Sequence, residues 1–202
     1  ILALAMHRAP LAYLEGALAN PVLQPGLVLQ ILKQNPAITG PLIARIGRNR
    51  AWLKPYEVKT AIVLHPRTTR VLAMSLVQFL WWRDLARVAD HAALAPPLRR
   101  AAERLLSIRL QELALGEKIA LARIATRGVI GVLRRQNEPL VIRALLQNPR
   151  LVEADALAIE LKEKLNVAKL EVMRISPVLG VHTGPGIVGA AVLPMNLVED
   201  LM

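Results

Sequence analysis

The sequence contains no cysteine among its 202 residues. Disulfide bonds and thiolate metal sites are therefore excluded, and the absence fits a protein of a reducing compartment. The four histidines, His7, His65, His91 and His182, are far apart, and none has a second metal ligand at helical spacing. No Gly-x-Ser-x-Gly motif and no phosphate-binding glycine loop is present. The residues therefore indicate no metal ion and no cofactor, and we expect that the protein is not an enzyme.

Acidic side chains are scarce, because 26 Lys and Arg residues stand against 15 Asp and Glu residues and the net charge is +11. The imbalance is uneven along the chain. Residues 1–150 hold 22 basic and 8 acidic residues, a charge of +14, whereas residues 151–202 hold 4 and 7, a charge of −3. Two segments of different composition therefore meet near Leu151. A natural fusion, an engineered chain or a misassigned sequence would each produce such a change.

The sequence also lacks an uninterrupted apolar run suited to a membrane. Its longest uncharged run, Ile175 to Val198, contains three prolines and four glycines. Such a run would leave backbone polar groups unsatisfied in lipid, so no transmembrane segment is expected. The chain begins at Ile1 without a basic stretch, apolar run and cleavage site, which is typical of a fragment or processed product without a signal peptide. We expect a location in the bacterial cytoplasm.

Proline is present at a recurring junction, in which Asn or His stands immediately before it. The junction occupies residues 18–21, 33–36, 63–66 and 146–149. Asn and His suit the end of a helix, and proline cannot continue one. Internal repetition of this kind predicts a chain of short helices.

Apolar residues between the junctions come in doublets four residues apart, which is one face of an α-helix. The doublets are Leu27/Val28 with Ile31/Leu32, Leu42/Ile43 with Ile46, Val71/Leu72 with Ser75/Leu76 and Phe79/Leu80, Leu98 with Ala101/Ala102 and Leu105/Leu106, and Leu140/Val141 with Ala144/Leu145. A lone helix of about ten to twelve residues is marginal in water, so these helices must bury their doublets against neighbours.

The period and the doublets resemble the HEAT and armadillo class of bacterial helical repeats across about residues 1–160. The resemblance implies a mainly α fold, a right-handed α-solenoid of short HEAT-like helices. An irregular all-α bundle with coincidental junctions is the alternative. We expect one helical-repeat domain over residues 1–160 and a small C-terminal α/β or two-strand appendage over residues 161–202.

The C-terminal segment alternates as a strand does over Lys169–Ile175, and the apolar run Ile187–Leu193, on the other side of a Gly-Pro-rich loop, is interpreted as a second strand. With that loop, residues 161–195 resemble the end of the DegV family of fatty-acid-binding proteins. The resemblance implies that His182 and Thr183 donate to a bound carboxylate, while Gly184 and Gly186 permit close backbone approach. A strand pair that merely closes the helical stack is the alternative.

Arginines occupy positions between the doublets. In a solenoid the equivalent positions of successive helices line up, so these residues could form a basic stripe able to neutralise phosphates. A solvated outer face is the alternative. The candidate nucleic-acid-binding residues are Arg45, Arg48, Arg83, Arg87, Arg100, Arg104, Arg123 and Arg127.

Three of the six aromatic side chains lie in one segment, residues 78–85. Some HEAT-like DNA glycosylases keep Trp and an acidic residue in the concave groove, and Trp81, Trp82 and Asp84 offer these residue types. Residues one and two apart on a helix do not share a face, so we expect one Trp in the core, the other at an edge, and Asp84 in a surface ion pair with a neighbouring arginine.

Solenoids offer extended surfaces, and this sequence offers no catalytic set. We therefore expect a non-enzymatic helical-repeat scaffold that binds a protein partner on its concave face. Nucleic-acid binding through an arginine stripe is one alternative. Fatty-acid binding by the DegV-like C-terminal segment is another.

Overall fold

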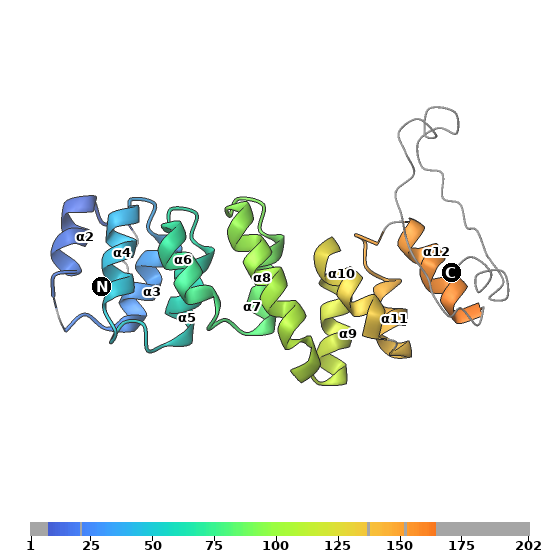
Figure 1. The fold of residues 1–202 in the computed structure, drawn as a ribbon. Helices are drawn as coiled ribbons and strands as arrows, with labels where there is room; N and C mark the ends of the chain where they lie inside the picture. The colour runs from blue at the N-terminus through green and yellow to red at the C-terminus, as the bar shows by residue number, and fades with distance from the viewer. Residues whose placement is uncertain (1–7, 21, 137, 152, 165–202) are drawn as a thin grey trace, which may run out of the picture. The chain divides into compact units, whose positions relative to one another are not determined.

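The computed structural model describes residues 8–20, 22–136, 138–151 and 153–164. It divides the chain into two compact units, Ile1–Arg150 and Leu151–Met202. The division falls where the composition changes near Leu151. The described residues are mainly helical and contain no strand, in agreement with the expected mainly α class (Figure 1).

The described part of the first unit holds ten α-helices and two short 3-10 turns. The helices are α2 (Leu11–Ala17), α3 (Pro25–Gln34), α4 (Gly40–Arg48), α5 (Tyr56–Leu64), α6 (Arg70–Val77), α7 (Trp82–Asp90), α8 (Pro96–Arg109), α9 (Leu115–Ile124), α10 (Arg127–Leu133) and α11 (Pro139–Leu145). The turns are η1 (Leu110–Glu112) and η2 (Arg134–Gln136). Proline stands in the first turn of α3, α4, α8 and α11, where no N–H donor is needed.

The helices of the first unit form two rows. In the first row α3, α5, α7, α9 and α11 pack side by side in that order. In the second row α6, α8 and α10 pack likewise, and α4 meets α6 where Gly47 lies against Leu72. A Cβ atom at residue 47 would come within 2.7 Å of the Leu72 side chain, so glycine permits this approach. Consecutive helices therefore alternate between the rows.

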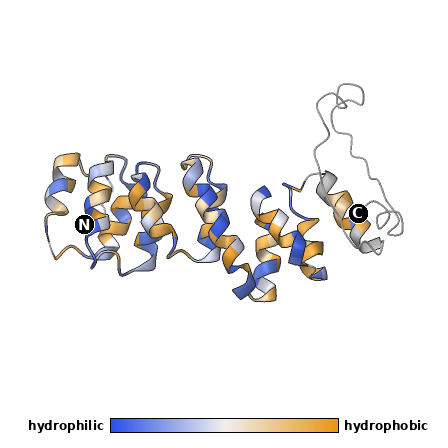
Figure 2. Cartoon of the chain, viewed as in Figure 1, coloured by the Kyte–Doolittle hydropathy of each residue, from blue (hydrophilic) through white to orange (hydrophobic). Residues whose placement is uncertain are grey.

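The apolar doublets supply the core, although unequally. Val28, Ile31 and Leu32 of α3 are buried, and apolar and polar residues share the helices of this unit (Figure 2). The expectation that both members of each doublet face the core is wrong for Val71, Phe79 and Leu140, which are exposed. The second residue of a doublet is the one that turns toward the neighbouring helices.

Side chains tie alternate loops together at a constant spacing. Trp52 Nε1 donates to the Leu23 carbonyl 29 residues earlier, over 2.9 Å. Arg67 Nη1 donates to the Ile38 carbonyl, also 29 residues earlier, over 2.6 Å. Arg109 Nη1 donates to the Leu80 carbonyl at the same spacing and distance. Each of these ties therefore joins a loop or helix end to a segment two helices earlier in the chain.

Two junction asparagines make a similar tie from inside the protein. Asn35 and Asn148 are both buried, with only 4% of each residue exposed. Their side-chain amides donate to the carbonyls of Ala9 (3.1 Å) and Ala122 (2.7 Å), in both cases 26 residues earlier. Their Oδ1 atoms accept from the N–H two residues on. The side chain of the exposed Asn20 accepts from the Val22 N–H, which is a local contact.

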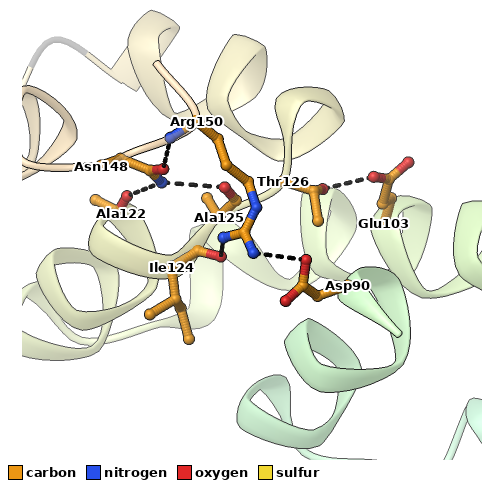
Figure 3. A network of polar contacts seen from close by, with 8 residues as sticks. All are labelled: Asp90, Glu103, Ala122, Ile124, Ala125, Thr126, Asn148 and Arg150. Carbon is orange, nitrogen blue, oxygen red and sulfur yellow. Dashed lines mark hydrogen bonds and ion pairs between the residues drawn. The ribbon is translucent and has the colours of Figure 1, made fainter. Parts of the chain in front are cut away.

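Further polar contacts surround Asn148 (Figure 3). Its amide also donates to the Ala125 carbonyl over 3.0 Å. Arg150 forms an ion pair of 2.7 Å with Asp90, which lies 60 residues earlier at the end of α7. The last junction of the first unit is thus joined both to the loop after α9 and to α7.

The second unit contains α12 (Glu153–Lys164). The expected domain boundary between residues 160 and 161 lies within this helix. The expected strands Lys169–Ile175 and Ile187–Leu193 lie outside the described residues, as does the uncharged run Ile175–Val198. Within the described ranges, no helix combines the length and apolar character needed to cross a membrane.

Replacing Asn148 tests the buried tie. Asn148→Ala removes the donor of two carbonyls and the acceptor of one N–H, so the free energy of unfolding should fall by about 2–3 kcal/mol in urea denaturation followed by circular dichroism. Asn148→Asp should cost at least as much, because a carboxylate cannot donate to a carbonyl. The matched change Asn20→Ala, at an exposed junction, should cost less than about 1 kcal/mol. Equal losses at the two junctions would contradict the buried tie.

Candidate functional site

A groove with a volume of about 1160 Å³ lies on the first row of helices. It is lined by the end of α3, by one face of α5, by the loop after α5 and by the start of α7. Apolar side chains of Leu32, Ala61 and Leu64 contribute to its walls. The groove therefore extends over three helices of the same row.

An aromatic pair stands in the groove. The rings of Tyr56 and Trp81 are stacked, with 4.6 Å between their centroids and 21° between their planes. The Tyr56 hydroxyl accepts from the Trp81 backbone N–H over 2.9 Å and donates to Asp84 Oδ2 over 2.6 Å. Burial, followed by the hydrogen bond to Asp84, raises the pKa of Tyr56 and keeps the hydroxyl protonated as a donor. Trp81 is nevertheless 68% exposed.

Asp84 holds this arrangement together. One carboxylate oxygen accepts from Tyr56, and the other forms an ion pair of 2.9 Å with Arg87 Nη1. The expected ion pair of Asp84 with a neighbouring arginine is therefore confirmed. Because both oxygens are already engaged, Asp84 acts as a positioning group for Tyr56.

Trp82, unlike Trp81, does not line the groove. It is 8% exposed, so the expectation of one Trp in the core and the other at an edge is confirmed. Its indole N–H donates to Glu117 Oε1 over 2.9 Å, and the Arg83 guanidinium lies 5.2 Å from its ring centroid. The Trp82 hydrogen bond, a bond from the Ala114 N–H and the charge of Arg83 lower the pKa of Glu117. Glu117 thereby joins the first turn of α9 to α7.

His65 ends α5 at the edge of the groove. Its Nδ1 accepts from the Arg67 N–H over 3.1 Å, as Asn does at the other junctions, which confirms its expected role as a helix-end residue. Burial lowers the pKa of His65, and the positive charge of Arg67 lowers it further. The imidazole is therefore held neutral, with Nδ1 free of a proton.

Positive charge exceeds negative charge around the groove. Lys33, Arg67, Arg83 and Arg87 line it together with two acids, Glu57 and Asp84. Arg67 uses Nη1 to bind the Pro36 and Ile38 carbonyls, and Arg87 is paired with Asp84. Lys33 and Arg83 are both exposed, and Arg83 lies over the Trp82 ring.

The eight arginines expected to form a stripe are all exposed, but they lie on both rows of helices. Two pairs are brought together. Arg83 and Arg87 line the groove, whereas Arg45 and Arg48 line a smaller pocket between the ends of α2 and α4. The remaining four are Arg100 and Arg104 on α8, Arg123 on α9 and Arg127 on α10.

The expected fatty-acid site falls outside the described residues, since His182, Thr183, Gly184 and Gly186 all lie beyond residue 164. In the part of the chain that the structure describes, no group of three or more His, Cys, Asp or Glu side chains is placed to hold a metal ion. The sequence pattern did not indicate Tyr56 and Lys33 as site residues. Tyr56 could have been found from its position, because it stands one helix pair before Trp81.

Comparison with known proteins adds no relative, because no protein-family model, curated protein or solved structure matches the chain. The candidate site therefore rests on the arrangement of its residues in the structure alone.

Replacing Tyr56 by Phe tests the aromatic pair. The Trp81 N–H loses its acceptor and Asp84 loses a donor, so the free energy of unfolding should fall by about 1 kcal/mol. Trp52 and Trp82 are buried, so rapid motion of an indole side chain should come from Trp81. Time-resolved fluorescence anisotropy should show greater tryptophan mobility in Tyr56→Phe, and Trp81→Phe should remove that component. Unchanged mobility would contradict a Trp81 held by the hydroxyl.

The lowered pKa of His65 gives a pH dependence of defined sign. Because the folded-state pKa lies below the ordinary value of 6.5, the stabilisation by the neutral imidazole is complete above pH 6.5 and is lost as the pH falls through the folded-state pKa. The corresponding loss for Glu117 begins only below its ordinary value of 4.5. Melting temperatures should therefore decrease from about pH 7.5 to about pH 5.5, and His65→Asn should reduce that decrease while keeping the acceptor for Arg67. A decrease of the same size in His65→Asn would refute this assignment.

Proposed function

We propose that the helix pairs of the first unit stack as a right-handed α-solenoid of the HEAT class, and that the protein is a non-enzymatic scaffold. The alternation of consecutive helices between two rows supports the stacking. So do the ties of Trp52, Arg67 and Arg109, which each reach a carbonyl 29 residues earlier. In such a stack the first row provides the concave face, and the groove lies on it.

The proposed function of the groove is to bind a protein partner, and the observation that carries it is the exposed, fixed ring of Trp81. Trp, Tyr and Arg are the residues that most often dominate binding energy at protein interfaces. Trp81 is held by a ring contact to Tyr56 and by its backbone N–H, so binding need not immobilise it. A fixed aromatic ring next to arginines is therefore suited to anchor a partner.

The polar groups of the groove support binding more than catalysis. Asp84 has both oxygens engaged, by Tyr56 and Arg87. His65 is used to end α5, with Nδ1 accepting from Arg67. Asp84 and His65 are thus engaged in contacts that hold the groove in shape.

Nucleic-acid binding through an arginine stripe is less well supported than protein binding. The eight candidate arginines are divided between the two rows, so one continuous stripe along the first row would use only some of them. Fatty-acid binding rests on residues outside the described part of the chain.

A photo-crosslinking amino acid at Ala61, in the groove wall, tests the proposal against the same group at Arg104, on α8 of the other row. Crosslinking in the native cell extract should attach a protein at residue 61 and not at residue 104. The captured protein, once identified and purified, should bind the intact chain at least about tenfold more tightly than Trp81→Ala.

The control for that binding measurement is Arg104→Ala, which should leave the affinity unchanged. Binding that does not depend on Trp81, or equal capture at the two positions, would overturn the proposed partner site. Capture of RNA or DNA at residue 61 would establish the nucleic-acid alternative instead.

A further inference from the structure

We propose that the segment bound in the groove is an acidic peptide that places one aromatic side chain on the open face of Trp81. This inference rests on the proposed function and specifies the chemistry of the partner. Two observations carry it, the one-sided stacking of Trp81 and the excess of positive charge along the same groove.

Trp81 has one ring face available. Tyr56 covers the other face, with the two centroids 4.6 Å apart, while 68% of Trp81 remains exposed. The hydrogen bond from its backbone N–H to the Tyr56 hydroxyl fixes where α7 begins relative to α5. Aromatic rings attract one another in stacked or edge-to-face geometry beyond their buried area. The open face therefore suits a Phe, Tyr or Trp of the partner.

The charges beside this ring favour carboxylates. Lys33 lies in the last turn of α3, and Arg83 lies in the first turn of α7, so the two exposed cations come from different helices of the groove. Of the acids in the groove, Asp84 is neutralised by Arg87, which leaves Glu57 as the opposing charge. An acidic segment thus gains complementary charge, whereas a basic one would be repelled.

A peptide fits these observations better than single-stranded nucleic acid. Proteins that bind unpaired strands stack successive bases on a series of aromatic rings along a basic groove. Tyr56 and Trp81 are the aromatic residues that line this groove, and Trp81 covers Tyr56. One platform with apolar walls of Leu32 and Leu64 accommodates a single anchoring side chain flanked by carboxylates.

The probe is a nonapeptide with four glutamates on each side of a central phenylalanine. It contains no tryptophan, so the intrinsic fluorescence of the intact chain reports binding at Trp81. Two matched peptides carry glutamine for glutamate or alanine for phenylalanine. We expect the parent peptide to bind about tenfold more tightly than the glutamine peptide and about fivefold more tightly than the alanine peptide.

Matched double variants separate the groove from the general positive charge of the chain. Lys33→Gln with Arg83→Gln removes two cations from the groove, and Arg100→Gln with Arg104→Gln removes two from α8. Only the groove variant should weaken binding of the parent peptide, by about tenfold. Thermal melting of both variants checks that they are folded. Equal weakening by the two variants would overturn the inference, because it would mean attraction to net charge alone.

A double-mutant cycle tests the ring contact, with binding measured by isothermal titration calorimetry because Trp81→Ala removes the fluorescent reporter. Trp81→Ala should weaken binding of the phenylalanine peptide by about fivefold and leave the alanine peptide unchanged. The same loss for both peptides would overturn the stacking. If an oligothymidylate binds more tightly than the acidic peptide and Trp81→Ala removes that binding, the occupant of the groove is single-stranded nucleic acid and not a peptide. If a partner crosslinks at residue 61 but no acidic peptide binds, this inference fails while the proposed function stands.

Discussion

The first unit depends on one kind of contact, in which a side chain in or beside a loop donates to a main-chain carbonyl 29 residues earlier. Each accepting carbonyl belongs to a buried residue that stands two positions before the start of a helix, and a buried main-chain acceptor needs a partner. Trp52, Arg67 and Arg109 each satisfy a main-chain carbonyl across the same spacing. The contact that removes an unpaired acceptor therefore also fixes the distance between successive pairs.

The groove is a product of this regular packing. Arg67 holds the loop after α5 against the loop after α3, and both loops line the groove. Tyr56 then joins α5 to α7 through the Trp81 N–H and Asp84. The groove is thus built by residues that the packing of the helices holds in place, without a long loop.

Local signals in the sequence predicted much of this architecture. The Asn-Pro and His-Pro junctions located helix ends, and the spacing of Trp81 and Trp82 indicated that these two side chains take different directions, whereas Asp84 lines the same groove as Trp81. The sequence did not distinguish the buried Asn35 from the exposed Asn20, although both stand before proline. That difference depends on whether an earlier loop lies across the junction. The contact of Tyr56 with Trp81 likewise depends on how α5 and α7 pack.

Three ties span the same 29 residues, so they constrain the lengths of the helices and loops that lie between their two ends. One extra residue within α5 would rotate the later residues of the helix by about 100° and carry Arg67 away from the Ile38 carbonyl. If the helix pairs stack as proposed, a change of length by whole helix pairs would preserve contacts of this kind, whereas an insertion within one helix would break them.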